Sequence, residues 1–222
     1  MELIEEKLDP SFVRELHKIV KNYDTYLEKK NLSINYINLY QKNLNINKYD
    51  YLLDYIKKVE HIKKDLERTT ILYYGFIISQ PGNSTQHFHL DYRGQTLTYF
   101  IPLCELTDKN GTEFLYFYDE SNYSKYFNVF NEITHKYINK DELIEYLKTI
   151  NLHYERDYEF RIANSQANRL IRMPNYVFHR GKTNESDNRR IMFQLTLELK
   201  PVDFIQNMEF IEIAEEDEIY LN

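Results

Sequence analysis

Hydrophobic and polar positions follow two different periods in two parts of the chain. In residues 10–67 the apolar residues recur with the helical period of about 3.6 residues. In the first segment they are Phe12, Leu16, Ile19 and Val20. In the second they are Leu52, Leu53, Ile56, Val59 and Ile62. Asp9 stands at a candidate N-cap and Pro10 at the first helical position, so we expect residues 10–67 to be helical.

From residue 69 onward the pattern changes to short β-branched and aromatic runs separated by turn residues. These runs predict strands in TTILYYGFIIS, QTLTYFIPL, GTEFLYFY, YEFRIA, NRLIRMPNYVFHR and RRIMFQLTLELK. Residues 121–152 interrupt them with a helical insertion, and residues 201–222 read as a final strand and an acidic tail. Strands that do not alternate with helices predict one mostly β domain, an antiparallel barrel or double sheet with helices packed outside it.

Composition and charge narrow the functional classes. The net charge of −7 argues against a sequence-independent nucleic-acid binder, which needs a basic face. The single cysteine, Cys104, excludes an intrachain disulfide and fits a reducing compartment. The first residues contain no apolar signal-peptide core, and no apolar run is long enough to span a bilayer. We therefore expect a cytoplasmic protein without membrane association.

The segment QHFHLDYRGQTLTYFIPL carries the clearest chemical signal. His89 and Asp91 stand at alternate positions, so on a strand their side chains project together, with the Cα atoms about 6–7 Å apart. His179, at the end of another strand-like run, is the best third ligand. Two histidines and one carboxylate are the ligand set of non-haem Fe(II) oxygenases. Eleven positions later, Arg190 begins a strand and could hold the distal carboxylate of a dicarboxylate co-substrate.

With these residues the chain resembles the Fe(II)- and 2-oxoglutarate-dependent dioxygenases, most closely their phytanoyl-CoA dioxygenase-like branch. FHLD is similar to the first metal motif of that branch, and TYFIPLCELTDKNGTEFLYF to its strand, Asn-Gly turn and returning strand. HRGKTNESDNRR is similar to its His…Asn…Ser/Thr…Arg signature, with Asn184 and Ser186 in the expected places. The resemblance covers residues 70–200 and implies a double-stranded β-helix, or jelly-roll, core.

The resemblance also implies roles for individual residues. His89, Asp91 and His179 would bind Fe(II), and Arg190 would pair with the far carboxylate of 2-oxoglutarate, with Arg189 facing outward. Oxidation by O2 would release succinate and CO2 and hydroxylate a substrate. Hydroxylation is expected rather than halogenation, because the halogenating members of the family have a small residue in place of Asp91. Thr98 and Tyr99 are further candidates for contact with 2-oxoglutarate, although adjacent strand residues face opposite sides.

Other interpretations remain open at this stage. His87 with His89 and His179 could form a three-histidine site of the cupin type, with Asp91 outside the ligand set. The chain could also be a non-catalytic double-sheet binding module. A lid-like placement of the N-terminal helices and of the insertion favours a small-molecule substrate, a peptide substrate stays possible, and nucleic acid is disfavoured.

Overall fold

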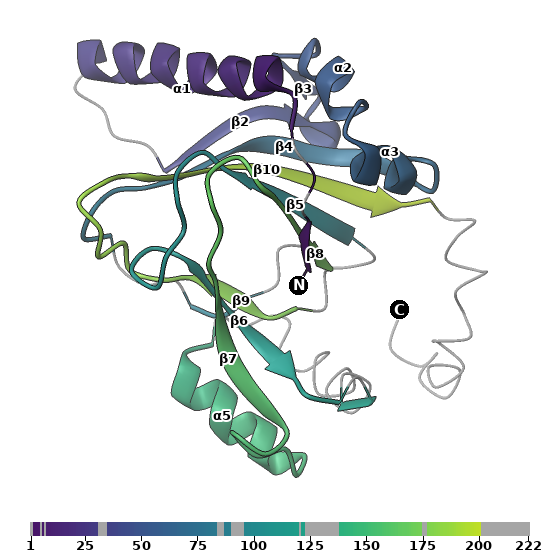
Figure 1. Cartoon of the computed structure of the whole chain (residues 1–222), viewed down its shortest axis with the longest axis vertical. Helices are drawn as coiled ribbons and strands as arrows, with labels where there is room; N and C mark the ends of the chain where they lie inside the picture. Colours follow the sequence, from purple (N-terminus) through teal and green to yellow (C-terminus); the bar gives the residue numbers. More distant parts are fainter. Residues whose placement is uncertain are drawn as a thin grey trace.

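The computed structural model describes residues 2–4, 6, 8–30, 35–83, 87–89, 96–119, 121–122, 138–174 and 177–200. Within these ranges two antiparallel β-sheets lie one above the other, with helices on their outer sides (Figure 1). The expected mostly β, double-sheet architecture is therefore confirmed.

The larger sheet has seven strands, and its neighbouring strands all pair antiparallel. Their order is β1 (Glu2–Ile4), β8 (Leu170–Pro174), β5 (Thr96–Pro102), β10 (Arg190–Leu199), β4 (Thr69–Ser79), β2 (Tyr36–Gln41) and β3 (Ile46–Asn47). The smaller sheet has the order β7 (Tyr158–Ala163), β6 (Thr112–Phe117) and β9 (His179–Gly181).

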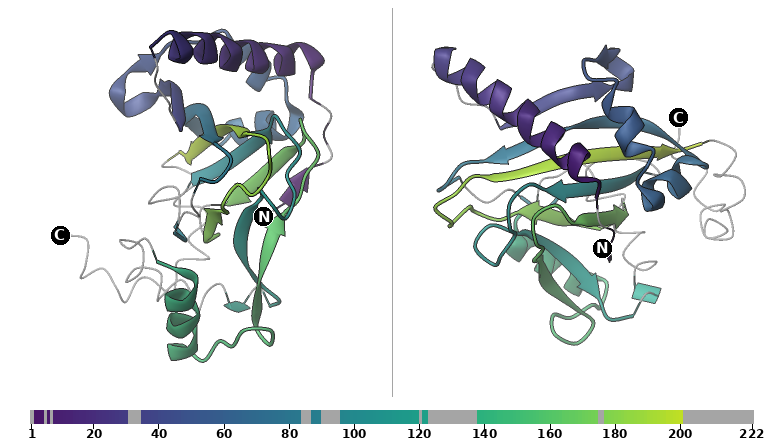
Figure 2. Two further views of the ribbon diagram at one scale, coloured as in Figure 1. Left: turned by 90° about the vertical axis from the view of Figure 1, so that its left-hand side faces the viewer. Right: turned by 45° about the horizontal axis from the view of Figure 1, so that its top comes forward.

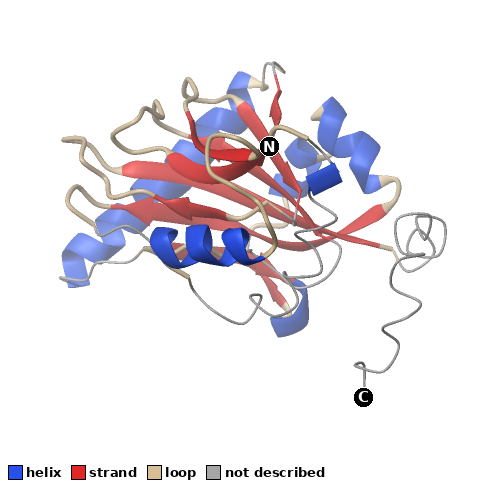
Figure 3. Cartoon of the chain, turned by 90° about the horizontal axis from the view of Figure 1, so that it is seen from below, coloured by secondary structure: helices blue, strands red, loops and turns tan. Residues whose placement is uncertain are grey.

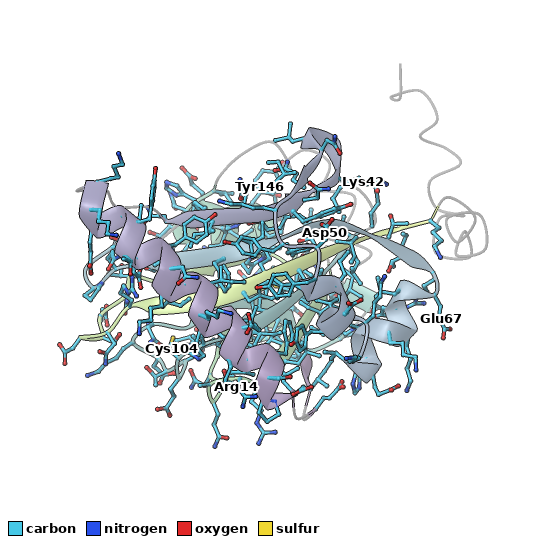
Figure 4. The ribbon with its side chains drawn as sticks, turned by 90° about the horizontal axis from the view of Figure 1, so that it is seen from above. Arg14, Lys42, Asp50, Glu67, Cys104 and Tyr146 are labelled. Carbon is cyan, nitrogen blue, oxygen red and sulfur yellow. The ribbon has the colours of Figure 1, made fainter. Side chains whose placement is uncertain are left out.

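Helices cover the outer face of the larger sheet. They are α1 (Pro10–Lys30), α2 (Leu52–Ile56) and α3 (Glu60–Leu66), and α1 runs across the strands in Figures 2 and 4. Asp9 caps α1 as expected, since its carboxylate accepts the Ser11 backbone N–H at 2.8 Å. The ring of Phe12 meets that of Phe193 on β10 at a centroid distance of 6.0 Å. Among the described residues, no helix combines the length and the apolar character that crossing a membrane requires.

The expectation that all of residues 10–67 are helical is wrong between α1 and α2. Residues 36–41 form β2, followed by the short 3₁₀ helix η1 (Lys42–Leu44) and by β3. Ile37 and Leu39 are buried while their neighbours are more exposed, which is a period of two. The apolar face thus matches a strand that extends the larger sheet beside β4.

The expected helical insertion contains α5 (Lys140–Thr149), which packs on the outer side of the smaller sheet (Figure 3). Its N-terminus has a capping box, in which Asn139 accepts the Glu142 backbone N–H at 2.9 Å and Glu142 accepts that of Asn139 at 3.2 Å. The part of the insertion at 123–137 and the expected final strand and tail at 201–222 lie outside the described residues.

Strand alternation gives each sheet an outer and an inner face. On β10, Phe193, Leu195 and Leu197 pack against the helices, whereas Met192 packs between the two sheets. Met192 shares that inner cluster with Phe100 on β5 and Phe114 on β6. The inner space between the sheets is therefore where functional side chains can meet.

Candidate active site

The structure brings His89 and His179 directly opposite each other. Their backbones form an antiparallel bridge, with the His89 N–H donating to His179 O at 2.9 Å and the His179 N–H donating to His89 O at 3.1 Å. Residues that pair in this way present their side chains on the same face of a sheet. The two imidazole centroids are 4.6 Å apart, so residues ninety positions apart in sequence form one site.

Both rings are oriented by a backbone carbonyl two residues earlier in the chain. Nδ1 of His89 lies 2.9 Å from the carbonyl oxygen of His87, and Nδ1 of His179 lies 3.0 Å from that of Val177. A carbonyl oxygen only accepts, so each neutral ring carries its proton on Nδ1 and its lone pair on Nε2. Metal-binding histidines are commonly oriented in this way, and the pair fits a divalent metal.

The third ligand expected from the sequence, Asp91, lies outside the described residues. Within the described part of the chain no three His, Cys, Asp or Glu side chains gather closely enough to hold a metal. His87 is exposed and does not join His89 and His179. The three-histidine site that the sequence left open is therefore not formed by these residues.

Arg190, the expected anion-binding residue, is buried at the start of β10. Only 3% of it is exposed, and its Nη1 donates to the carbonyl oxygens of Asn110 at 2.9 Å and Gly111 at 3.1 Å. Its Nε has no hydrogen-bond partner in the described structure, which also shows no carboxylate paired with it. Burial lowers the pKa of this guanidinium, against smaller opposing effects of Cys104 and Tyr36. A buried cation in this state is stabilised by an anionic ligand.

A cavity of about 250 Å³ adjoins Arg190. It is lined by Asn35, Tyr36, Ile77, Ile78, Ser79, Asn83 and Arg190. Ser79 on β4 is the register partner of Arg190 on β10, and Ile77 on β4 is the register partner of Tyr36 on β2. The cavity thus presents a cation together with hydroxyl and amide groups, a combination that suits a carboxylate.

Arg189 faces the other way. Its Nη1 and Nη2 atoms donate to the two carboxylate oxygens of Asp24 on α1, at 2.6 and 2.7 Å. Adjacent residues on a strand project to opposite faces. Arg189 therefore ties α1 to the outer face of the sheet, while Arg190 turns toward the inside.

The same alternation separates Thr98 from Tyr99. Thr98 lies on the inner face, where its Oγ1 is 3.3 Å from Oγ1 of Thr196. Tyr99 lies on the outer face and donates to the Asp65 carboxylate on α3, and its hydroxyl also meets the His61 carbonyl oxygen at 3.3 Å. The expectation that Tyr99 contacts a co-substrate is thus wrong, because its ring packs among the residues beneath the helices.

The loop between His179 and Arg190 is fastened by Asn184, which has no exposed surface. Its Nδ2 donates to the carbonyl oxygens of Ser79 at 3.0 Å and Asn188 at 2.8 Å. Its Oδ1 accepts the Ser186 hydroxyl at 2.6 Å. Asn184 and Ser186 therefore act as loop formers, as expected for these residue types.

Residues further along β6 were not singled out in the sequence. Arg190 contacts Gly111 just before β6, His179 pairs with Phe114, and Tyr116 follows on the same face as Phe114. The Arg161 guanidinium carbon lies 3.3 Å from the centroid of the Tyr116 ring. Arg161 is the register partner of Phe114 and so shares that face, but it is exposed and also pairs with Glu159. The alternation of YEFRIA was the available signal for this pair, which lies beyond the histidines as seen from Arg190.

No protein-family model matches the sequence, and no curated protein matches it by sequence. Solved structures do match. AviO1 from Streptomyces viridochromogenes Tue57 has a TM-score of 0.57 at 12% identity, with 87% of this chain and 86% of AviO1 covered. The non-haem α-ketoglutarate-dependent carbocyclase SnoK from nogalamycin biosynthesis has a TM-score of 0.58 at 12% identity, with 88% and 78% covered.

HygX from Streptomyces hygroscopicus, whose crystal structure contains nickel and 2-oxoglutarate, has a TM-score of 0.57 at 8% identity. The match covers 90% of this chain and 82% of HygX. Similarity at such low identity establishes a common fold. The chain therefore shares the double-stranded β-helix fold of non-haem, α-ketoglutarate-dependent enzymes.

Proposed function

We propose that this chain is an Fe(II)- and 2-oxoglutarate-dependent oxygenase that hydroxylates a small organic molecule. The observation that carries the proposal is the facing pair of His89 and His179, each with Nδ1 on a backbone carbonyl oxygen. Two imidazoles oriented in this way fit two positions of a site with two histidines and one carboxylate. Asp91, two residues after His89 and outside the described residues, supplies the carboxylate in this proposal.

Arg190 is the residue that we assign to the co-substrate. The distal carboxylate of 2-oxoglutarate would accept hydrogen bonds from its guanidinium in the adjoining cavity, and the burial of Arg190 without a carboxylate partner supports this role. Thr98, on the inner face of β5, is a further candidate contact. Bound iron would supply the redox chemistry by which O2 oxidises the substrate while 2-oxoglutarate becomes succinate and CO2.

Apolar side chains surround the histidines on the inner faces of the sheets. Phe100 lies 6.5 Å from His179 between ring centroids, and it clusters with Phe114 and Met192. Such surroundings keep water away from reacting groups and strengthen electrostatic interactions with bound ligands. Along β6, the contact of Gly111 with Arg190 comes first, the pairing of Phe114 with His179 second, and Tyr116 last. This order leaves the space beside Tyr116 for the substrate. The origin of SnoK in nogalamycin biosynthesis supports a small organic substrate.

The proposal is tested by adding Fe(II) and then 2-oxoglutarate to the anaerobic protein. We expect a weak visible metal-to-ligand charge-transfer band in the wild type that is lost in Asp91→Ala and weakened in Arg190→Ala. Slow formation of succinate on exposure to O2 should accompany the band. A folded wild type that binds metal but gives neither the band nor succinate would contradict the proposed function.

A further inference from the structure

The two histidines have immediate neighbours that pack together on the opposite face of their strands. Phe88 precedes His89 and has no exposed surface, and Arg180 follows His179. The Arg180 guanidinium carbon lies 4.6 Å from the centroid of the Phe88 ring, within cation–π range. The bridged segments thus carry the two imidazoles on the inner face and the Phe88–Arg180 contact on the outer face.

Glu113 on β6 is the centre of this outer contact. It is 6% exposed and accepts Nε and Nη2 of Arg180 at 2.7 and 2.6 Å, both at Oε2. Its other oxygen accepts Lys140 Nζ at 2.7 Å. Burial disfavours its ionisation, but the hydrogen bonds from Lys140 and Arg180 outweigh burial and hold its pKa below the ordinary value. The group is therefore a buried carboxylate with two cationic partners.

The second cation comes from the insertion. Lys140 is the first residue of α5, and its Nζ also lies 4.3 Å from the centroid of the Phe160 ring on β7. Just before α5, Ile138 forms a backbone bridge with Phe88 through hydrogen bonds of 2.9 and 3.2 Å. The start of α5 is therefore linked to the strand of His89 through Ile138, and to that of His179 through Glu113 and Arg180.

We propose that Glu113 is a positioning residue for His89 and His179, and that α5 helps to set the spacing of the two imidazoles through it. Each ring is fixed to a carbonyl two residues earlier in its own segment, so a displacement of β9 relative to residue 88 moves the Nε2 atoms apart by a similar amount. Metal affinity depends steeply on such distances. The inference rests on the metal site of the proposed function.

The test compares Glu113→Gln with a matched control, Asp65→Asn. The Asp65 side chain is 10% exposed against 8% for Glu113, and it pairs with two arginines, Arg172 and Arg68 at 3.1 Å each, on the outer face of the larger sheet. Both substitutions thus remove a buried carboxylate with two cations. The measurements are Co(II) affinity by calorimetry, the visible spectrum of the Co(II) protein, and the thermal midpoint of the metal-free protein.

We expect Glu113→Gln to weaken Co(II) binding about tenfold and to alter the Co(II) spectrum, the scale of effect seen when support of metal ligands is removed. Asp65→Asn should lower the thermal midpoint comparably but leave Co(II) affinity within about twofold of the wild type and the spectrum unchanged. Equal effects of the two substitutions on affinity would overturn the inference, because Glu113 would then be merely structural.

Lys140→Met keeps the test decisive if Glu113→Gln does not fold, because it leaves the Glu113–Arg180 pair in place. We expect a smaller loss of Co(II) affinity with the same spectral change, and wild-type binding by this folded variant would overturn the role of α5. Failure of the wild type to bind Co(II) would instead overturn the proposed function. If the wild type binds Co(II) and Glu113→Gln binds it with the same affinity and spectrum, only the positioning role is overturned.

Discussion

Replacing Arg190 by methionine should separate stability from co-substrate binding. Arg190 is 3% exposed, has no carboxylate partner in the described structure, and leaves Nε without a hydrogen-bond partner. A structural arginine would be expected to stabilise the folded protein strongly through its contacts. An arginine kept for a ligand would instead be poorly compensated until that ligand binds.

The contacts of Arg190 give the magnitudes. Its two hydrogen bonds to Asn110 and Gly111 come from a charged donor, and such bonds contribute about 1.5–3 kcal/mol each. Against this, desolvation of an uncompensated buried ion costs several kcal/mol in real proteins. Because Arg190→Met removes both effects, we expect the free energy of unfolding of the ligand-free protein to change by no more than about 1–2 kcal/mol. Loss of the carboxylate contact costs at least about 2 kcal/mol of binding, or about 30-fold in Kd for 2-oxoglutarate.

The assay combines urea unfolding of the ligand-free protein with calorimetric titration of 2-oxoglutarate into the Co(II) protein. Arg189→Met is the matched control, since it removes an arginine that pairs with Asp24 on the outer face. The control should lose about 1 kcal/mol or less of stability and retain its affinity for 2-oxoglutarate. A loss of more than about 3 kcal/mol in Arg190→Met, with unchanged affinity for 2-oxoglutarate, would refute the reasoning.

Three further substitutions test other parts of the structure. Burial raises the pKa of Asp65, but hydrogen bonds from Tyr99 and Arg172 outweigh burial and hold this pKa below the ordinary 3.8. The Asp65 carboxylate therefore contributes stability above pH 3.8, and this contribution is lost as the pH falls through the lower pKa of the folded state. Asp65→Asn should therefore reduce the fall in the free energy of unfolding at acid pH, measured by urea unfolding at a series of pH values. An unchanged slope of this free energy against pH would contradict the reasoning. Asn184→Ala should lower the free energy of unfolding by about 2–3 kcal/mol, because it leaves buried partners on the loop and on β4 unpaired; a loss under about 0.5 kcal/mol in urea unfolding would be inconsistent with that role. Gly75→Ala should destabilise by about 1–3 kcal/mol in thermal unfolding, since its Cβ would collide with the Ile37 carbonyl oxygen and the Tyr73 hydroxyl, and a neutral result would show that this contact relaxes freely.

The sequence predicted the elements whose periodicity covers many residues. The first helical segment buries one continuous face, whereas central strands such as β4 and β10 are buried on both faces, and each of these elements leaves a clear apolar pattern in the sequence. Residues 36–41 were missed because only Ile37 and Leu39 are buried there, and two positions do not distinguish a strand from a helix. Pairing with β4, a contact distant in sequence, decides the conformation of this segment.

The site was predictable as far as strand alternation and residue chemistry reach. The sequence predicted that His89, His179 and Arg190 belong to one site, because imidazoles bind metal ions and a guanidinium binds a carboxylate. Each of the three residues also stands at or near the end of a strand-like run. It could not decide between Thr98 and Tyr99, because either residue could face inward until the register with β10 and the position of α3 are known. The carboxylate of Asp65, which holds the Tyr99 hydroxyl, comes from a helix that no local pattern connects to β5.

Glu113 was visible in the sequence as an unusual residue, but the sequence alone could not identify its partners. A glutamate inside the apolar run TEFLYF is unfavourable in a buried strand unless cations compensate it. The compensating residues, Arg180 and Lys140, come from β9 and from the insertion, so only the folded chain identifies them. The alternation that directs His179 inward directs Arg180 outward to Glu113. A substitution on the outer face of the smaller sheet would therefore alter the proposed metal site without touching a ligand, which is the behaviour that the Co(II) comparison measures.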